Sequence, residues 1–247
     1  MSVYEASELR ERYEGMTVRA VAKCTFETVL VGGQPATDKG LEMFCRHKLG
    51  LDGQELADAV KRIRDQEIGD RDATNGGEVK EAESYGVNCL RHDDDGACWL
   101  GNWQIKACLK QAASRLGIFK KAIGTKGDMA EMGRAEAFGI SAGSHRERIR
   151  IMNPDGSPYM GNQFEKFMGR VNTPQGAKSI VHDSETAPAG CQFEFEFRMP
   201  GKLVTEEQLV SVFSAAMVCG LGSAKAMERG KFRIDRLELF GDFKGKA

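Results

Sequence analysis

The chain has 247 residues, of which 41% are hydrophobic and 29% are charged, and its formal net charge is −1. This composition is typical of a soluble globular protein with a sizeable core, and the lack of a run of about eighteen apolar residues excludes a transmembrane helix. The first residues lack the basic start and apolar stretch of a secretory signal, so we expect a cytoplasmic protein with no membrane partner.

Seven cysteines are spread through the chain, and no two of them form a C-x-x-C pair. The odd number and this spacing argue against a disulfide framework and against a zinc ribbon. We therefore expect the cysteines to be small core residues of a protein in a reducing compartment. We predict neither a metal site nor a cofactor.

Charge is distributed unevenly along the sequence. The segment 52–95 holds thirteen acidic and six basic residues, whereas the segment 98–127 holds six basic residues and no acidic one. Such a separation can build a positive face on a nearly neutral molecule, which makes nucleic acid a candidate partner. The alternative is that both segments are ordinary solvated surfaces.

The sequence of the N-terminal half predicts one long strand followed by two helices. Alternating apolar residues indicate a strand over 16–30, which ends in the glycine loop 31–35. Helical spacing follows over 41–49 and again over 55–68. The polar, acidic segment 69–86 is typical of a loop or an insertion.

A short strand over 87–90 and a turn over 92–96 come before the next predicted helix. We expect Asn102 to cap this helix, which should run to about Leu116. Its apolar stripe consists of Ile105, Leu109, Ala112 and Leu116. Three aspartates of the turn lie beside His92, a combination that occurs in metal sites. Because consecutive side chains diverge on an extended chain, we favour a solvated turn.

The C-terminal half has the clearest periodicities. A basic strand lies within 139–151, and a hairpin or irregular excursion is expected over 153–189, which holds four of the six prolines. Three phenylalanines alternate with charged residues over 191–199, which predicts a strand. A capping box, Thr205-x-x-Gln208, begins a helix that ends at Gly220.

The last predicted strand covers 231–240, and its alternation slips by one residue at Asp235-Arg236, so we expect a bulge there. Amphipathic strands that alternate with helices predict an α+β fold, in which helices cover one face of an antiparallel sheet. No composition break divides the sequence, so we expect a single domain over 1–247.

Two segments are candidate phosphate-binding sites. The loop Gly220-Leu221-Gly222-Ser223-Ala224-Lys225 can bring backbone N–H groups and the charges of Lys225 and Arg229 to a phosphate. It follows a helix instead of preceding one, so it matches no dinucleotide or Walker fingerprint. The alternative is a glycine C-cap with a basic turn.

The second candidate segment is Trp99-Leu100-Gly101-Asn102-Trp103-Gln104-Ile105-Lys106, where a loop meets a helix N-terminus. Unpaired N–H groups there favour anions, and the tryptophans are able to stack on bases, although we expect Trp99 to lie in the core. The strand phenylalanines Phe193, Phe195 and Phe197 are either a base-stacking platform or a core face. Their spacing of two favours the core.

Taken in order, these segments resemble the backbone subunits of CRISPR effector complexes, which are members of the RAMP superfamily. Four places carry the resemblance: Val31-Gly32-Gly33 with Asp38 downstream, the segment Leu100–Lys106, the segment Glu185–Phe195, and the glycine loop Gly220–Lys225 with Gly230-Lys231-Phe232. The likeness spans about 16–240. It departs from the family pattern at Leu100–Lys106, which lacks the usual serines and final glycine, and in the C-terminal loop, which has fewer glycines and arginines.

The resemblance implies an RRM-like, ferredoxin-like antiparallel sheet with helices on one face and a protruding thumb hairpin. Insertions would lie at about 52–97, which is acidic, and at 146–188, which is the thumb. It also implies a cytoplasmic ribonucleoprotein of antiviral defence, in which copies form a filament along a single-stranded guide RNA with other effector subunits.

The resemblance also implies roles for particular residues. Lys106, Lys225 and Arg229 would meet phosphates, and Arg146, Arg148 and Arg150 would flank the thumb. The turn and loop residues Gly101, Asn102, Trp103, Gly220, Gly222 and Ser223 complete the expected RNA-binding set. Some members cut target RNA with an aspartate after the first strand, and Asp38 is the matching position here; the alternative is that Asp38 caps the next helix.

Three functions therefore stay open. The first is a non-catalytic RNA-binding subunit, and the second is an endoribonuclease that uses Asp38. The third is a RAMP-fold protein with another use, such as a single-stranded nucleic-acid coat or a decoy from a mobile element.

Overall fold

The computed structural model describes residues 5, 7–8, 15–35, 41–42, 45–46, 51–63, 88–118, 135–173 and 176–245. Its centre is a four-stranded antiparallel sheet in the order β12-β1-β11-β7. The strands are β1 (Thr17–Phe26), β7 (Glu136–Gly139), β11 (Gln192–Pro200) and β12 (Phe232–Phe240).

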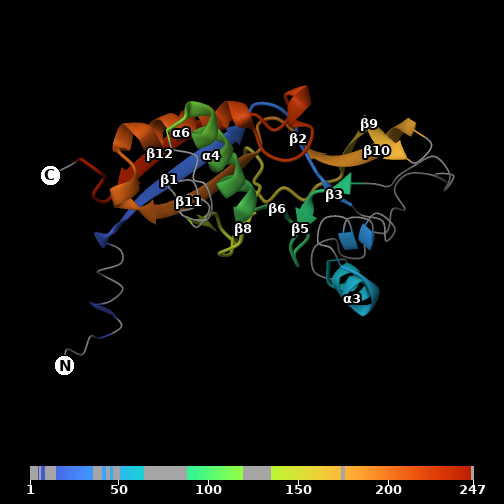
Figure 1. Cartoon of the computed structure of the whole chain (residues 1–247), viewed down its shortest axis with the longest axis horizontal. Coiled ribbons are helices and arrows are strands. Elements are labelled where there is room, and N and C mark those ends of the chain that lie inside the picture. Colours follow the sequence, from blue (N-terminus) through green and yellow to red (C-terminus); the bar gives the residue numbers. More distant parts are fainter. Residues whose placement is uncertain are drawn as a thin grey trace.

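Two helices complete this unit: α4 (Asn102–Leu116) follows β1, and α6 (Glu206–Cys219) joins β11 to β12. Numbered within the unit alone, the chain order is βαββαβ and the strand order is 4-1-3-2, which is the ferredoxin-like arrangement. Figure 1 shows both helices over the same face of the sheet. The predicted α+β fold is confirmed.

The face under the helices holds together because small residues on β1 lie opposite large ones on β11. Ala20 pairs with Phe197, Ala22 with Phe195, and Cys24 with Phe193. The three rings are at most 2% exposed, so they are core residues and not a base-stacking platform. Phe213 of α6 packs on the rings of Phe195 and Phe197, with both centroid distances at 6.2 Å.

Local signals in the sequence position α6 and β12 as expected. The Thr205 hydroxyl accepts a hydrogen bond from the Gln208 backbone N–H, and the Gln208 side chain accepts one from the Thr205 N–H, so the capping box is confirmed. The register of β1 against β12 shifts between Lys23 and Cys24, which leaves Asp235 as the extra residue. The predicted bulge is therefore confirmed, and the Thr25 hydroxyl donates to its carboxylate.

A long hairpin is the second main feature. It consists of β9 (Gln163–Thr173) and β10 (Gly176–Ala187), and Figure 1 shows it extending away from the four-stranded sheet. At its root, β10 pairs with β2 (Leu30–Val31) and β4 (Asn88–Cys89), and β4 pairs with β3 (Gln34–Pro35).

A third, small sheet precedes α4. Its order is β5-β6-β8, with β5 at Arg91–His92, β6 at Cys98–Gly101 and β8 at Arg148–Arg150. Helix α3 (Gly53–Ile63) contributes to a separate apolar cluster with Leu41, Cys45 and Cys89. The short 3-10 helices are η2 (Gly201–Leu203) and η3 (Lys225–Met227).

Several expected boundaries differ from the structure. The first strand ends at Phe26, because the chain turns there and resumes as β2 beside the hairpin. The hairpin fills only the C-terminal part of the expected insertion 146–188, since β8 pairs with β6 and Met152 bridges Gln192. Leu116, expected on the apolar stripe of α4, is 45% exposed. The predicted loop 69–86 lies outside the described residues.

None of the helices in the described part of the chain has the length and apolar character needed to cross a membrane.

We expect Phe195→Ala to lower the free energy of unfolding by about 3–5 kcal/mol, because it opens a cavity between the sheet and α6. Urea denaturation measures this loss. The control is Val218→Ala in α6, because Val218 is 63% exposed. It should lower the free energy of unfolding by less than about 0.5 kcal/mol. Equal losses for the two variants would contradict the described packing.

Candidate nucleic-acid interface

Two glycine loops that are distant in sequence pack against each other. A Cβ added to Gly33 would overlap the Ser223 hydroxyl, and a Cβ added to Gly222 would meet Leu30 and the Val31 carbonyl. The Ser223 N–H also donates to the Val31 carbonyl at 3.0 Å. We call this contact the glycine junction, and it consists of Gly32, Gly33, Gly220, Gly222 and Ser223.

The glycine junction lies at the root of the hairpin. Gly32 donates its N–H to the carbonyl of Glu185 in β10 at 2.8 Å, and a Cβ at Gly32 would overlap the Cys89 backbone. Gly222 has a φ of +73°, a conformation that residues with a Cβ rarely adopt. Three segments therefore meet here with backbone against backbone: β2, β10 and the loop after α6.

Beside this root, a groove of about 450 Å³ opens between the start of β9 and the loop that contains η3. Its lining carries both signs of charge and one apolar ring. The lining residues are Thr28, Glu165, Lys166, Phe167, Met227, Glu228 and Arg229.

The start of α4 differs in detail from the sequence prediction. The N-cap is Gly101 and not Asn102, which is the first helical residue. Gly101 has no side chain to cap with, but its N–H donates to the Gln104 side chain at 2.9 Å. Asn102 donates its own N–H to the Glu147 carbonyl at 3.1 Å. Gly220 is the C-cap of α6, as in the alternative interpretation of this loop, and its N–H donates to the Ala216 carbonyl.

Arginine and tryptophan side chains gather beside this helix start. Trp99 and Trp103 meet edge to face with ring centroids 5.9 Å apart, and Trp99 is buried while Trp103 is 42% exposed. The Arg91 guanidinium lies 4.8 Å from the Trp103 ring centroid, and that of Arg148 lies 5.3 Å from the Trp99 ring centroid. We call these four residues the Arg–Trp cluster. Trp99 lies in the core, as predicted.

Arg150 is held by the turn that precedes β6. Its Nε donates to the Asp93 carboxylate at 2.6 Å, and its terminal nitrogen contacts Asp95. The Asp93 side chain is only 5% exposed, so the prediction of a wholly solvated turn is wrong at this residue, whereas Asp94 and Asp95 are exposed. Burial of the guanidinium lowers the pKa of Arg150, whereas its contacts with Asp95 and Asp93 raise it. Overall, the pKa of Arg150 lies above its usual value.

Two further arginines of the predicted set also have carboxylate partners. Arg146 donates to Glu136 at 3.0 Å, and Arg229 donates to Glu165 at 3.0 Å across the groove. The Arg146 side chain is 72% exposed and that of Arg229 is 33% exposed. A phosphate at either position would compete with an existing ion pair.

The two predicted lysines lie on α4 and on the loop after α6. Lys106 is half-buried and Lys225 is exposed. Burial raises the pKa of the Cys108 thiol to about 12, and the positive charge of Lys225 opposes that rise.

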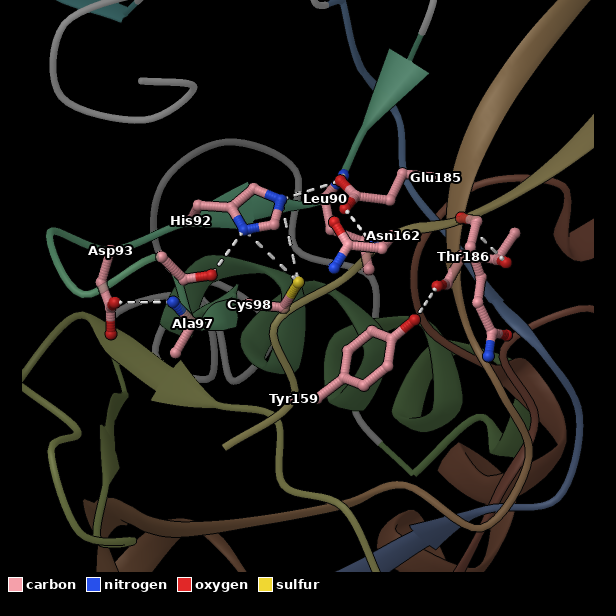
Figure 2. A network of polar contacts seen from close by, with 11 residues as sticks. Leu90, His92, Asp93, Ala97, Cys98, Tyr159, Asn162, Glu185 and Thr186 are labelled. Atoms are coloured by element: carbon pink, nitrogen blue, oxygen red, sulfur yellow. Dashed lines mark hydrogen bonds and ion pairs between the residues drawn. The ribbon is translucent and has the colours of Figure 1, made fainter. Parts of the chain in front are cut away.

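A buried polar network connects the small sheet to the hairpin root (Figure 2). His92 Nε2 lies 2.8 Å from the Glu185 carboxylate, which also accepts the N–H groups of Leu90 and Asn162. The Tyr159 hydroxyl donates to the Thr186 carbonyl at 2.6 Å. Sequence reasoning placed His92 beside a turn and Glu185 in a family motif, but it predicted no pairing between them, since no local pattern joins residues 93 positions apart.

The structure brings the predicted residues together in two groups. Gly101, Asn102, Trp103, Arg148 and Arg150 lie on or beside the small sheet, where Gly101 pairs with Arg148 and Trp99 with Arg150. The second group consists of Gly220, Gly222 and Ser223 of the glycine junction, with Lys225 and Arg229 on the chain that follows. Asp38 lies outside the described residues.

No protein-family model matches the chain, and no curated protein matches it. Among solved structures, it is similar to a chain in the cryo-EM structure of the Type III-B Cmr-beta bound to cognate target RNA, with 8% identity and a TM-score of 0.42. The alignment covers 96% of this chain and 68% of that one. A likeness of this degree does not assign the chain to a family.

We expect Arg150→Met to lower the free energy of unfolding by about 3 kcal/mol, because it leaves the buried Asp93 carboxylate without its cation. Chemical denaturation measures the loss. The control is Arg146→Met, whose exposed ion pair with Glu136 should contribute no more than about 0.5 kcal/mol. If the Arg150 variant is as stable as the control, Arg150 does not hold the turn.

Proposed function

We propose that this chain is a non-catalytic, single-stranded RNA-binding subunit that grips the backbone of a guide RNA in a CRISPR effector complex. The observation that carries the proposal is the glycine junction, where two glycine motifs far apart in sequence pack together at the root of a long hairpin. The ferredoxin-like strand order supports it as well, because it is the core that the sequence resemblance implies.

The chemistry around the glycine junction suits a sugar–phosphate strand. The glycines themselves are covered by other segments of the chain, and the cations beside them, Lys225 and Lys166, offer contacts to phosphates. Phosphate contacts of this kind hold a strand without reading its sequence.

The Arg–Trp cluster offers a second contact. Trp103 is partly exposed at the start of α4, and the Arg91 guanidinium lies near its ring. An exposed indole can stack on a base of any identity, and arginine adds both charge and a planar surface. In the proposed complex this cluster contacts bases or sugars, while Lys106 approaches the phosphates. The N–H groups of Gly101 and Asn102, expected to be free for anions, are already donated to Gln104 and Glu147.

The paired arginines have a smaller part in binding. Arg146, Arg150 and Arg229 each donate to a carboxylate of the chain, so a phosphate would have to replace a partner already present. We therefore propose that Lys106, Lys225 and Arg148 contribute most of the charge that RNA meets, and that Arg150 chiefly holds the turn 92–96.

We propose that copies assemble along the RNA through the separation of charge in the sequence. The segment 52–95 is acidic and the segment 98–127 is basic, and opposite charges on successive copies would attract each other head to tail. Head-to-tail contacts of this kind do not have to form a closed ring. The copies would therefore extend along the RNA, with other effector subunits at the ends.

The proposal predicts that affinity for single-stranded RNA falls steeply with salt, with a slope of about −0.7 in log–log form for each phosphate contact. Lys225→Gln should make this slope about 0.7 less negative, and the double variant with Lys106→Gln should change it by about 1.4. Fluorescence anisotropy of a labelled RNA over a salt series measures both.

Lys202→Gln is the matched control, because Lys202 is exposed in η2 beyond the far end of β11 from the hairpin root. Its slope should equal that of the wild type. An unchanged slope for the double variant, with folding verified by circular dichroism, would refute the assigned phosphate contacts. Stronger binding to DNA of the same sequence would favour a single-stranded DNA coat instead.

A further inference from the structure

Three potential metal ligands converge where the small sheet meets the hairpin root. They are His92 of β5, Cys98 of β6 and Glu185 of β10, and their ligand atoms all lie within 4.8 Å of one another. Their exposures are 4%, 0% and 1%. Figure 2 shows the imidazole, the sulfur and the carboxylate around one point.

The imidazole is oriented as a metal-binding histidine would be. His92 Nδ1 lies 3.0 Å from the Gly96 carbonyl oxygen, which can only accept, so Nδ1 carries a hydrogen. Metal-ligating histidines very commonly donate this second N–H to a backbone carbonyl or carboxylate. Nε2 faces the Glu185 carboxylate at 2.8 Å, and the Cys98 sulfur lies beside the ring, 3.6 Å from Nδ1 and 3.8 Å from Nε2.

The carboxylate is also fixed in advance. Its two oxygens accept backbone N–H groups from Leu90 at 3.0 Å and Asn162 at 3.3 Å. Gly161 makes room for it, because a Cβ at that residue would overlap the Glu185 carboxylate and approach the His92 ring. In known metal sites, hydrogen bonds of this kind hold the ligating side chains in position.

We propose that His92 Nε2, the Cys98 thiolate and the Glu185 carboxylate bind one Zn²⁺ ion. A thiolate, an imidazole and a carboxylate form a donor set that suits Zn²⁺, and water fills the fourth tetrahedral position. The thiol proton and the proton shared between His92 and Glu185 pass to solvent. The two negative charges that remain balance the ion, so the buried site is neutral.

Binding of the ion requires two of the three ligands to move. Bonds of about 2.0–2.3 Å to Zn²⁺ place tetrahedral ligand atoms about 3.3–3.6 Å apart. The Cys98 sulfur lies 3.6 Å from Nδ1 and 3.8 Å from Nε2, so its side chain has to turn toward the Nε2 side of the ring to reach the ion. The Nε2-to-oxygen distance of 2.8 Å has to open by about 0.5 Å as the ion replaces the shared proton.

The ion would join segments that no local motif connects. His92 and Glu185 are 93 positions apart, so no local spacing such as C-x-x-C marks the site in the sequence. By holding β10 to the β5–β6 pair, it would fix the direction in which the hairpin leaves the body.

The test uses the full-length protein, stripped of metal with a chelator and titrated with Co²⁺. One equivalent of Co²⁺ should produce a thiolate-to-cobalt charge-transfer absorption together with intense tetrahedral bands, and Zn²⁺ should displace both. Cys98→Ser should abolish the charge-transfer band and weaken Zn²⁺ binding by about 100-fold or more. Cys219→Ser, which alters a buried cysteine of α6, is the matched control and should keep both signals.

A wild-type protein that binds no Co²⁺ stoichiometrically, or a band that survives in Cys98→Ser, would overturn the proposal. Glu185→Gln provides a second variant that keeps the shape of the side chain, and its Zn²⁺ affinity should fall at least about tenfold. Melting temperatures with and without Zn²⁺ give a further readout, because only proteins that bind the ion are stabilised by it.

Discussion

At the glycine junction, three chain segments approach so closely that its glycines have no room for a side chain of their own. A Cβ at Gly32, Gly33 or Gly222 would collide with the backbone or side chain of another segment. This contact joins β2, the loop after α6 and the hairpin root, and hydrogen bonds from Gly32 and Ser223 hold it in register. The hairpin direction, the groove beside Arg229 and the position of Lys225 all depend on it.

Charge pairing then decides which cations are available to a ligand. Arg150 is held by the aspartates of the turn, and Arg229 reaches across the groove to Glu165. On the open face of the central sheet, Arg19 and Arg198 both contact Glu196. A protein with a net charge of −1 therefore depends on a few well-placed lysines and on the Arg–Trp cluster to attract a polyanion.

Features set by neighbouring residues were predictable, and features set by distant pairings were not. The alternation of Phe193, Phe195 and Phe197 predicted β11, and Thr205 with Gln208 predicted the start of α6. In contrast, Asp93 is buried because Arg150 meets it from 57 positions away, and Glu185 is buried against His92 from a different sheet. Of the candidate site, the sequence predicted the glycine loops and the helix start but not the ion pairs that occupy three arginines.

The most direct measurement is ultraviolet cross-linking of the protein to single-stranded RNA, followed by mass spectrometry of the linked peptides. Binding at the glycine junction and the Arg–Trp cluster predicts cross-links within 99–106 and 220–231. Cross-links confined to the open face of the sheet, within 192–198 and 233–240, would contradict the proposed interface, and a complete lack of cross-links would contradict RNA binding itself.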